Sequence, residues 1–391
     1  MNLLIIGDAF SQYTIAFSRF LKLYDSTIKI DIINTRLVDS NKVSSEKFVN
    51  VYDKMYRNGF LNKFILRIPK LRGLIVRLAQ KKTVNEVNRV INEYDVICIH
   101  GFWKEALNVY NKLDASHTFT VGAVWGSDFY RRKKGDDSLF KAFDRCDRVL
   151  VATDEMENDI LAVYPLSPKK IRKCMFGLEP LETLFKMSGT SVPLNKKMFG
   201  FEEKAFVITC GHNASQFQEH LKIIDQLIEN QLELPPSYIL VFPVTYGGSK
   251  NYILKIKDKL QKSGLKHKLI EEYLTDEKIA LLRLATDIFI QVQKTDAFSG
   301  SMREHLFAQN IVITGDWLPY QSLSNEGIYF KTISDLNQLG GMVTNVIKNY
   351  EEFKQIVKDR NIPDKFQHFR WPVSIIEWHR VFLEYKYAKH E

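Results

Sequence analysis

The chain of 391 residues exceeds one ordinary hydrophobic core, and its hydrophobic content of 45% is typical of a globular protein, so we expect two domains. No run approaches ~20 uncharged apolar residues, so we expect no transmembrane helix, and the first apolar segment predicts a strand and not a signal peptide. The formal net charge of +9 is compatible with nucleic acid, an anionic membrane or an anionic substrate as partner.

Two series of short apolar runs predict two α/β domains with parallel sheets. The runs of the first half are residues 3–6, 28–33, 95–99, 119–124, 149–153 and 171–176. The runs of the second half are residues 205–209, 237–243, 267–270, 288–292 and 311–314. We place the first domain at residues 1–180, an irregular linker containing Pro193 at 181–201, and the second domain at 202–370.

The positive charge is concentrated between residues 54 and 82, where nine Lys or Arg occur without any Asp or Glu. An apolar stripe from Phe60 to Leu78 runs through this segment, which we expect to be mostly helical with a break near Pro69. Such a surface can lie on anionic lipid, each cation contributing roughly 1 kcal/mol, or it is a core helix with a basic solvent face. Few aromatic rings accompany the cations, so nucleic acid is not the expected partner.

Three polar residues follow predicted strands of the first half, at the edge where α/β proteins place ligands. Asp8 lies in the first turn, His100 follows the strand 95–99, and Asp128 follows the strand 119–124. His100 either acts on an acceptor substrate, as a base or as a hydrogen-bond donor, or it is an ordinary buried histidine. Asp128 is either a carboxylate that orients an acceptor substrate or a hinge segment, or it belongs to a turn that caps a helix.

Glycines and small polar residues follow the strands of the second half and suit a diphosphate. The predicted donor-site residues here are Gly211, His212, Asn213, Tyr246, Lys250, Tyr273, Lys294, Ser299, Gly300, Ser301 and Arg303. The chain has no D-x-D pair and no Cys/His cluster with zinc spacing, so we predict no metal ligands. The four cysteines form no C-x-x-C pair, so we expect reduced, packed thiols in a cytoplasmic protein.

Seven residues separate Asp296 from Glu304 across a loop-to-helix junction. This spacing resembles the E-x7-E signature of retaining GT-B glycosyltransferases, whose first carboxylate lies by the donor sugar and whose second binds the ribose. The resemblance implies those roles for Asp296 and Glu304. It also implies two Rossmann-like domains with parallel sheets facing a cleft, and a C-terminal helix, 371–391, that crosses back to the first domain. The chain departs from the pattern with Asp at the first acid and with Asn310, where the family usually has Gly.

Three segments of the second half are similar to bacterial 4-acetamido-4,6-dideoxygalactosyltransferases. They are G-H-N-A-S at 211–215, P-V-T-Y-G-G at 243–248 and E-Y-L-T-D-E-K-I-A-L-L-R at 272–283. That family is GT-B but inverting, and its acceptor is a polyprenyl-diphosphate sugar. The two resemblances imply opposite stereochemical outcomes, and inversion would need a base such as Asp8, His100 or Asp128. Many retaining relatives also hold the diphosphate with Arg and Lys, where this chain has His212 and His220.

These residues and resemblances together predict a metal-independent glycosyltransferase of the hexosyltransferase type, without a cofactor. The expected donor is a nucleotide-sugar, a UDP-sugar in the first place, and the expected acceptor is a glycan or polyprenyl-linked glycan of bacterial surface polysaccharide synthesis. We expect the protein in the cytoplasm, and the inner face of the plasma membrane is one site there that the basic segment 54–82 suggests. The alternatives are a nucleotide-sugar epimerase of GT-B fold and an inactive glycosyltransferase-like subunit that activates a partner.

Overall fold

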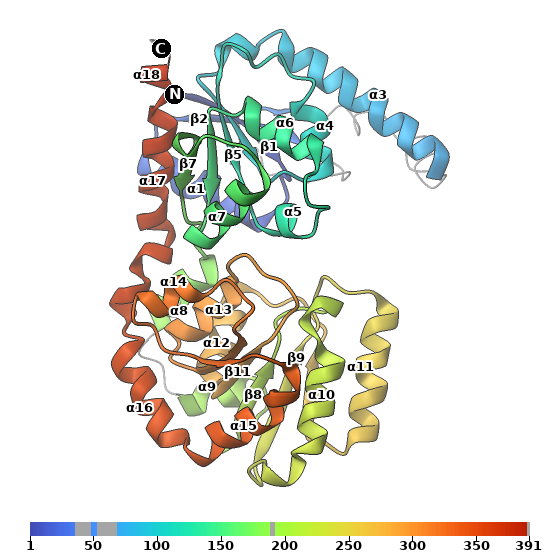
Figure 1. Cartoon of the computed structure of the whole chain (residues 1–391), viewed down its shortest axis with the longest axis vertical. Coiled ribbons are helices and arrows are strands. Elements are labelled where there is room, and N and C mark those ends of the chain that lie inside the picture. Colours follow the sequence, from blue (N-terminus) through green and yellow to red (C-terminus); the bar gives the residue numbers. More distant parts are fainter. Residues whose placement is uncertain (36–47, 53–68, 188–191, 389–391) are drawn as a thin grey trace. The chain divides into compact units, whose positions relative to one another are not determined.

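The computed structural model describes residues 1–35, 48–52, 69–187 and 192–388. The chain forms two compact units, each with its own parallel sheet (Figure 1). Unit 1 consists of Met1–Gly177 together with Trp371–Glu391, and unit 2 consists of Leu178–Arg370. The C-terminal segment is therefore part of the first unit.

Unit 1 contains a seven-stranded sheet of order β3-β2-β1-β4-β5-β6-β7, in which all pairs are parallel. Its strands are β1 (Asn2–Gly7), β2 (Lys29–Asn34), β3 (Val51–Tyr52), β4 (Val96–His100), β5 (Phe119–Ala123), β6 (Arg148–Val151) and β7 (Ile171–Lys173). In the described part of unit 1, the helices before the C-terminal segment are α1 (Gln12–Tyr24), α3 (Pro69–Asn88), α4 (Lys104–Tyr110), α5 (Ser127–Tyr130), α6 (Asp137–Arg145) and α7 (Asp154–Val163). The strands β4 and β5 are buried at every position, as expected for a parallel sheet covered on both faces.

Unit 2 contains a six-stranded parallel sheet of order β10-β9-β8-β11-β12-β13. Its strands are β8 (Phe206–Cys210), β9 (Tyr238–Pro243), β10 (His267–Ile270), β11 (Ile288–Gln291), β12 (Ile311–Gly315) and β13 (Lys331–Ile333). Its helices are α8 (Glu179–Met187), α9 (Val192–Met198), α10 (His220–Glu229), α11 (Lys250–Ser263), α12 (Asp276–Ala285), α13 (Gly300–Phe307), α14 (Gln321–Asn325), α15 (Leu339–Lys348) and α16 (Tyr350–Arg360). The chain order reverses between β8 and β11, which is the position where doubly wound sheets bind ligands.

The C-terminal helices α17 (Trp371–Leu383) and α18 (Tyr385–Ala388) complete unit 1, where α17 packs beside α1 (Figure 1). The Trp378 ring lies 4.9 Å from the Phe17 ring, and its Nε1 donates to the Met175 carbonyl at 2.9 Å. The Glu384 carboxylate pairs with Arg148 and Arg172 of β6 and β7. Buried rings and a double ion pair therefore fix the end of the chain to unit 1.

All the predicted strands are present, with small shifts at their ends, whereas the short strands β3 and β13 were not predicted. The irregular linker expected at 181–201 is instead largely helical, because it contains α8 and α9. Pro193 falls in the first turn of α9, where a helix tolerates proline. Leu181 and Leu184 give α8 a buried face, and α8 packs on α12.

The basic segment is only partly described, since residues 53–68 lie outside the described ranges. Helix α3 begins at Pro69, where we expect a break, and Figure 1 shows it extending from one side of unit 1. Arg77, Lys81 and Lys82 are exposed, and Leu78 is 53% exposed, so this part of the apolar stripe is not packed in a core. Among the described residues, no helix is both long enough and apolar enough to cross a bilayer.

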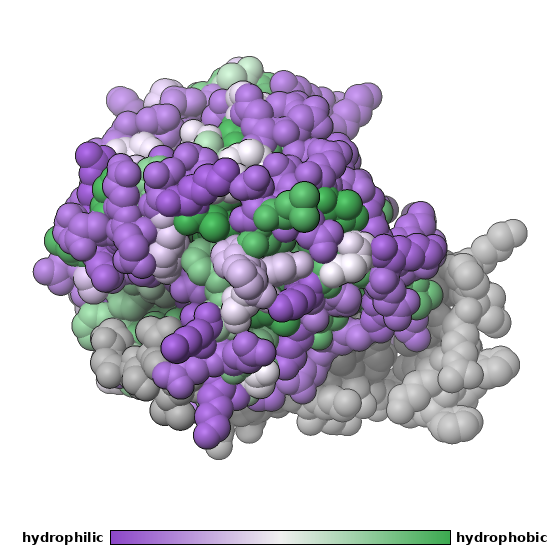
Figure 2. Space-filling view, turned by 90° about the horizontal axis from the view of Figure 1, so that it is seen from below, coloured by the Kyte–Doolittle hydropathy of each residue, from purple (hydrophilic) through white to green (hydrophobic). Residues whose placement is uncertain are grey.

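Figure 2 shows a largely hydrophilic face on which hydrophobic residues gather in a short band. Some exposed apolar surface is normal for a folded protein. The four cysteines are free and buried, as predicted.

Candidate functional site

The loops that follow β8 and β9 in unit 2 pack tightly against each other. Gly211 has φ +68°, and its N–H donates to Ile290 O on β11 at 3.0 Å. The Ala214 N–H donates to Tyr246 O at 2.7 Å, and a Cβ on Gly248 would lie only 2.1 Å from Ala214 O. These contacts bring three predicted residues, Gly211, Asn213 and Tyr246, to one edge of the sheet, at the carboxyl ends of its strands.

A chain of hydrogen bonds connects two predicted residues, His212 and Asp296, along this edge. His212 Nδ1 lies 3.2 Å from Gln291 Oε1, and Gln291 Nε2 lies 3.5 Å from the Tyr320 hydroxyl. The Tyr320 hydroxyl donates to Asp296 Oδ2. The sequence patterns did not indicate Gln291 and Tyr320, although a glutamine at the end of an apolar run is a signal that could have been used.

A second pair of buried amides, on Gln218 and Gln293, is connected to the loop that follows β8, residues 211–215, which we call the glycine loop. Gln218 Nε2 donates to Gln293 Oε1 at 2.5 Å, and Gln218 Oε1 accepts from the His212 N–H at 3.3 Å. Gln218, Gln291 and Gln293 are each at most 3% exposed. Because buried amides without partners are costly, these mutual hydrogen bonds fix the edge of the sheet in one arrangement.

Two opposing effects act on the pKa of Asp296. Burial raises the pKa of its carboxyl, whereas the hydrogen bonds from Tyr320 and from the backbone N–H of Ala297 lower it. Burial and the neighbouring Asp296 charge together raise the pKa of Tyr320 well above its usual range. Tyr320 therefore stays protonated and acts as a hydrogen-bond donor to Asp296 at neutral pH.

Glu304 lies on α13 and is 5% exposed, like Arg283 on α12. Arg283 Nε donates to Glu304 Oε2 at 3.0 Å, which makes a buried ion pair between two helices. Desolvation raises the pKa of Tyr246, and the charge of Glu304 adds to this effect. The Glu304 carboxylate therefore acts electrostatically on the Tyr246 hydroxyl.

The N-terminal turn of α13 carries the three predicted small residues. Ser299 is the N-cap, and its hydroxyl accepts from the Met302 N–H at 3.4 Å. The Ser301 hydroxyl is buried, and no hydrogen-bond partner for it is found within the described ranges. Arg303 is only 4% exposed and stacks on the rings of Phe298 and Phe369 at 5.0 and 5.2 Å, so its guanidinium is packed beside the turn.

The predicted cations and histidines differ in whether they can offer positive charge to a bound anion. Lys250 is exposed at the start of α11, whereas Lys294 Nζ lies 3.0 Å from Glu219 Oε1 in an ion pair. His220 is completely buried, and burial lowers its pKa to about 3. His220 is therefore neutral at physiological pH and does not supply the positive charge that its position in the sequence led us to consider. Tyr273 is 65% exposed in the loop after β10.

The predicted residues of unit 1 lie after β1, β4 and β5. Asp8 Oδ1 accepts from the Phe10 N–H at 2.9 Å in the first turn. His100 is 3% exposed, and burial lowers its pKa to about 3; its ring is surrounded by Phe17, Trp125, Phe176 and Trp378. The His100 ring contacts the Thr14 hydroxyl through Nδ1 at 3.0 Å. A neutral imidazole held in this way resembles a structural histidine more than an exposed base.

Asp128 is 2% exposed and accepts backbone N–H groups of Phe102 at 2.8 Å and Trp125 at 2.9 Å. Burial raises its pKa to about 6, although these hydrogen bonds oppose the shift. Asp128 thus ties together the loops after β4 and β5. Beside it is a hollow of about 560 Å³, whose lining includes Trp103, Asn108 and Arg132.

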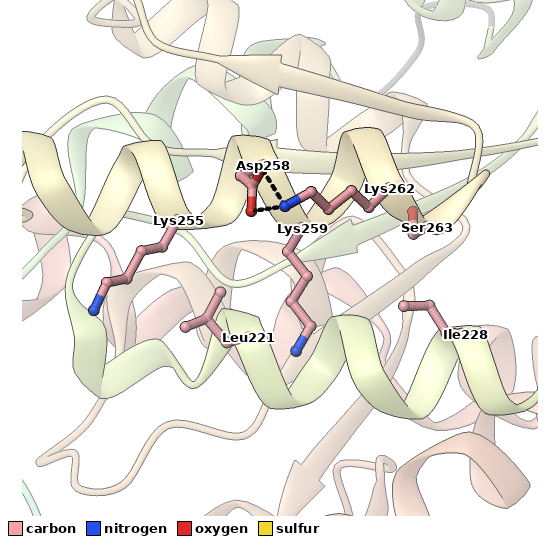
Figure 3. A pocket seen from close by; sticks show the side chains of 7 residues that line it. All are labelled: Leu221, Ile228, Lys255, Asp258, Lys259, Lys262 and Ser263. Carbon is pink, nitrogen blue, oxygen red and sulfur yellow. Dashed lines mark hydrogen bonds and ion pairs between the residues drawn. The ribbon is translucent and has the colours of Figure 1, made fainter.

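Figure 3 shows another hollow, of about 400 Å³, between α10 and α11 in unit 2. Lys255 and Lys259 point across it toward α10, and Lys262 pairs with Asp258 on its own helix. Lys259 also pairs with Asp225. This hollow is lined by helices and not by the loops at the carboxyl ends of the strands, where α/β sheets usually bind ligands. No group of three or more His, Cys, Asp or Glu suited to a metal ion occurs in the described part of the chain.

Solved structures identify the architecture. HepE from Anabaena, in complex with UDP and glucose, matches with a TM-score of 0.74 at 14% identity, over 98% of this chain and 100% of that chain. A glycosyltransferase from Rickettsia africae matches with a TM-score of 0.75 at 12% identity, over 100% and 99%. The chain has the GT-B fold.

The UDP-GlcNAc 2-epimerase from Neisseria meningitidis, bound to UDP-GlcNAc, matches this GT-B chain with a lower TM-score of 0.61 at 14% identity, over 99% and 100%. No protein-family model and no curated protein matches the sequence. The GT-B fold implied by the resemblance at Asp296 and Glu304 is therefore confirmed. The donor-site residues stay predictions, and the geometry above adds Gln291, Tyr320 and Arg283 to them.

Proposed function

We propose that the protein is a glycosyltransferase that takes a sugar from a nucleoside-diphosphate sugar bound to unit 2, with a UDP-sugar as the first candidate. The observation that carries the proposal is the edge of the unit 2 sheet. There a glycine loop, a helix N-terminus and the carboxylates of Asp296 and Glu304 follow strands at the point where the chain order reverses. HepE, which has the same fold, binds UDP and glucose.

The roles of the residues follow from the charge that develops during transfer. Breaking the anomeric C–O bond leaves negative charge on the diphosphate, which needs preorganised donors. The Gly211 and His212 N–H groups are used within the protein, so the N–H of Asn213 and those of Gly300 and Ser301 can supply these donors, with Lys250 as an exposed cation. Glu304 would accept from the ribose and Asp296 from the donor sugar, since a carboxylate only accepts hydrogen bonds.

The first test is a thermal-shift screen with UDP-, GDP- and TDP-sugars. A ligand at ~100 times its Kd stabilises the folded state by about 2.7 kcal/mol, so the correct nucleotide should raise the melting temperature clearly. No shift with any nucleotide-sugar would contradict the proposal.

The second test separates a transferase from an epimerase, which the likeness to the Neisseria meningitidis enzyme keeps as an alternative. The stabilising donor is incubated with the protein without an acceptor. A transferase should release nucleoside diphosphate only slowly by hydrolysis, whereas an epimerase should convert the sugar at its full rate. Addition of EDTA tests the predicted metal independence, because the transfer rate should not change.

For the acceptor we propose a glycan or polyprenyl-linked glycan bound to unit 1. Support comes from the hollow beside Asp128, where the 40% exposed Trp103 offers a ring for a sugar face and Asn108 offers an amide. The exposed Arg77, Lys81 and Lys82 of α3 support contact with an anionic membrane. Sedimentation with phosphatidylglycerol vesicles should capture the protein at low salt and release it at high salt, and equal binding to neutral vesicles would contradict the charge-based contact.

A further inference from the structure

The buried ion pair between Arg283 and Glu304 has a geometry that bears on nucleotide recognition. Only Oε2 of Glu304 accepts from Arg283, at 3.0 Å, and no other hydrogen bond to this carboxylate is present among the described residues. Oε1 lies on the side of the Gly300 backbone, 3.7 Å from the position that a Cβ on Gly300 would occupy. One oxygen is thus fixed by the protein while the other is available beside the helix N-terminus.

The pair is costly to bury and is therefore not explained by stability alone. Both side chains are 6–7% exposed, and removing two charges from water usually offsets most of the attraction between them. A carboxylate without a partner in such a place would be strongly disfavoured. Arg283 provides this partner to Glu304, and the hydrogen bond at 3.0 Å sets the direction of the carboxylate.

The surroundings hold Arg283 itself in place. The side chain of Asn310 donates to Arg283 O at 2.8 Å and contacts His305 Nδ1 at 2.6 Å. The His305 ring is stacked on Phe289 of β11, with centroids 3.8 Å apart. The end of α12, the end of α13 and the sheet are thereby connected through Asn310, so the two helices that carry the ion pair keep a fixed spacing.

We propose that Arg283 is a positioning residue for nucleotide binding, which holds Glu304 so that Oε1 accepts a hydrogen bond from a ribose hydroxyl. This inference rests on the proposed function and adds to it a residue that does not itself need to touch the nucleotide. It also specifies the ligand, because a nucleotide without ribose hydroxyls gains nothing from the pair.

The experiment compares UDP with 2′,3′-dideoxy-UDP by isothermal titration calorimetry on the full chain. The unmodified protein should bind UDP at least tenfold more tightly than the dideoxy analogue. Arg283→Met should reduce this ratio to about one by weakening UDP binding, while affinity for the analogue stays within about twofold. Arg360→Met, on the exposed end of α16, is the matched control and should keep the original ratio.

Because Arg283→Met leaves a buried charge, two further variants keep the test decisive if it does not fold. Arg283→Lys retains the charge and should give an intermediate ratio. The double variant Arg283→Met/Glu304→Gln has no buried charge and should also have a ratio near one. A merely structural role would weaken both ligands equally, so an unchanged ratio in these variants overturns the inference.

The outcomes for the unmodified protein are distinct. If it binds neither ligand, the proposed function itself fails. If it binds both equally well, nucleotide binding stands but the ribose contact, and with it the role of Arg283, is overturned.

Discussion

At the scale of single residues, the edge of the unit 2 sheet is a set of buried polar groups that satisfy one another. Gln291, Gln293 and Gln218 use their amides on neighbouring side chains and on the glycine loop. The Tyr320 hydroxyl ends this network at Asp296. Because partly satisfied networks are unstable, each member holds its neighbour in one orientation, which is the preorganisation that transition-state binding requires.

Tyr320→Phe tests this view of Asp296. The substitution removes the hydroxyl that lowers the pKa of Asp296, so burial should raise that pKa further. The acid limb of the pH–rate profile should then move to higher pH, and kcat should fall about tenfold, as expected for the loss of a hydrogen bond to a charged group. Tyr387→Phe, at a site 76% exposed, is the control, and identical profiles for all three proteins would contradict the role of Tyr320.

The raised pKa of Asp128 predicts that this residue contributes to the stability of unit 1 in a pH-dependent way. Its pKa in the folded state, about 6, lies above its unfolded value of 3.8, so the folded state binds its proton more tightly. This contribution is fully present below pH 3.8 and is lost as the pH rises through 6. The difference between the two pKa values corresponds to about 3 kcal/mol of unfolding free energy, of which about 2 kcal/mol should be lost between pH 4.5 and 7.5.

Asp128→Asn removes this titration, so the stability difference between the two proteins should fall by about 2 kcal/mol over that range. Urea unfolding monitored by tryptophan fluorescence is the measurement, because four of the five tryptophans belong to unit 1, and only Trp317 belongs to unit 2. A constant difference at every pH would show that Asp128 is charged in both states.

At the scale of elements, the loops after β8 and β9 depend on a close approach that only glycine permits. A Cβ at Gly248 would lie 2.1 Å from Ala214 O and 2.6 Å from Ala214 Cβ. Gly248→Ala should therefore separate the two loops and weaken UDP binding tenfold or more. Gly341→Ala on α15, where a Cβ would meet nothing within 4 Å, should leave the affinity unchanged. Equal affinities for the two variants would place the nucleotide elsewhere.

Elements with a strong apolar pattern were predictable from the sequence, and those defined by partners were not. The runs at 205–209 and 311–314 became buried central strands, whereas β13 has three residues and a weak pattern. Pro193 suggested an irregular linker, although proline also suits the first turn of a helix. Arg283 was missed because an arginine on a helix usually faces solvent, and only the fold brings it to Glu304.

At the scale of the whole molecule, each unit has its own sheet and its own hydrophobic core. Two cores predict two unfolding transitions in differential scanning calorimetry, one of which should coincide with the tryptophan signal of unit 1. UDP should raise the temperature of the other transition first, because its proposed site lies in unit 2. A shift confined to the transition with the tryptophan signal would place the nucleotide on unit 1.

The central claim is that Glu304 binds the ribose of a nucleotide on unit 2, and calorimetric titration of UDP tests it most directly. Loss of a hydrogen bond to a charged group costs about 1.5–3 kcal/mol, so Glu304→Ala should weaken UDP binding about 10- to 100-fold. Glu351→Ala, at an exposed site on α16, should bind UDP like the unmodified protein. If Glu304→Ala binds UDP as tightly as the unmodified protein, the account is contradicted.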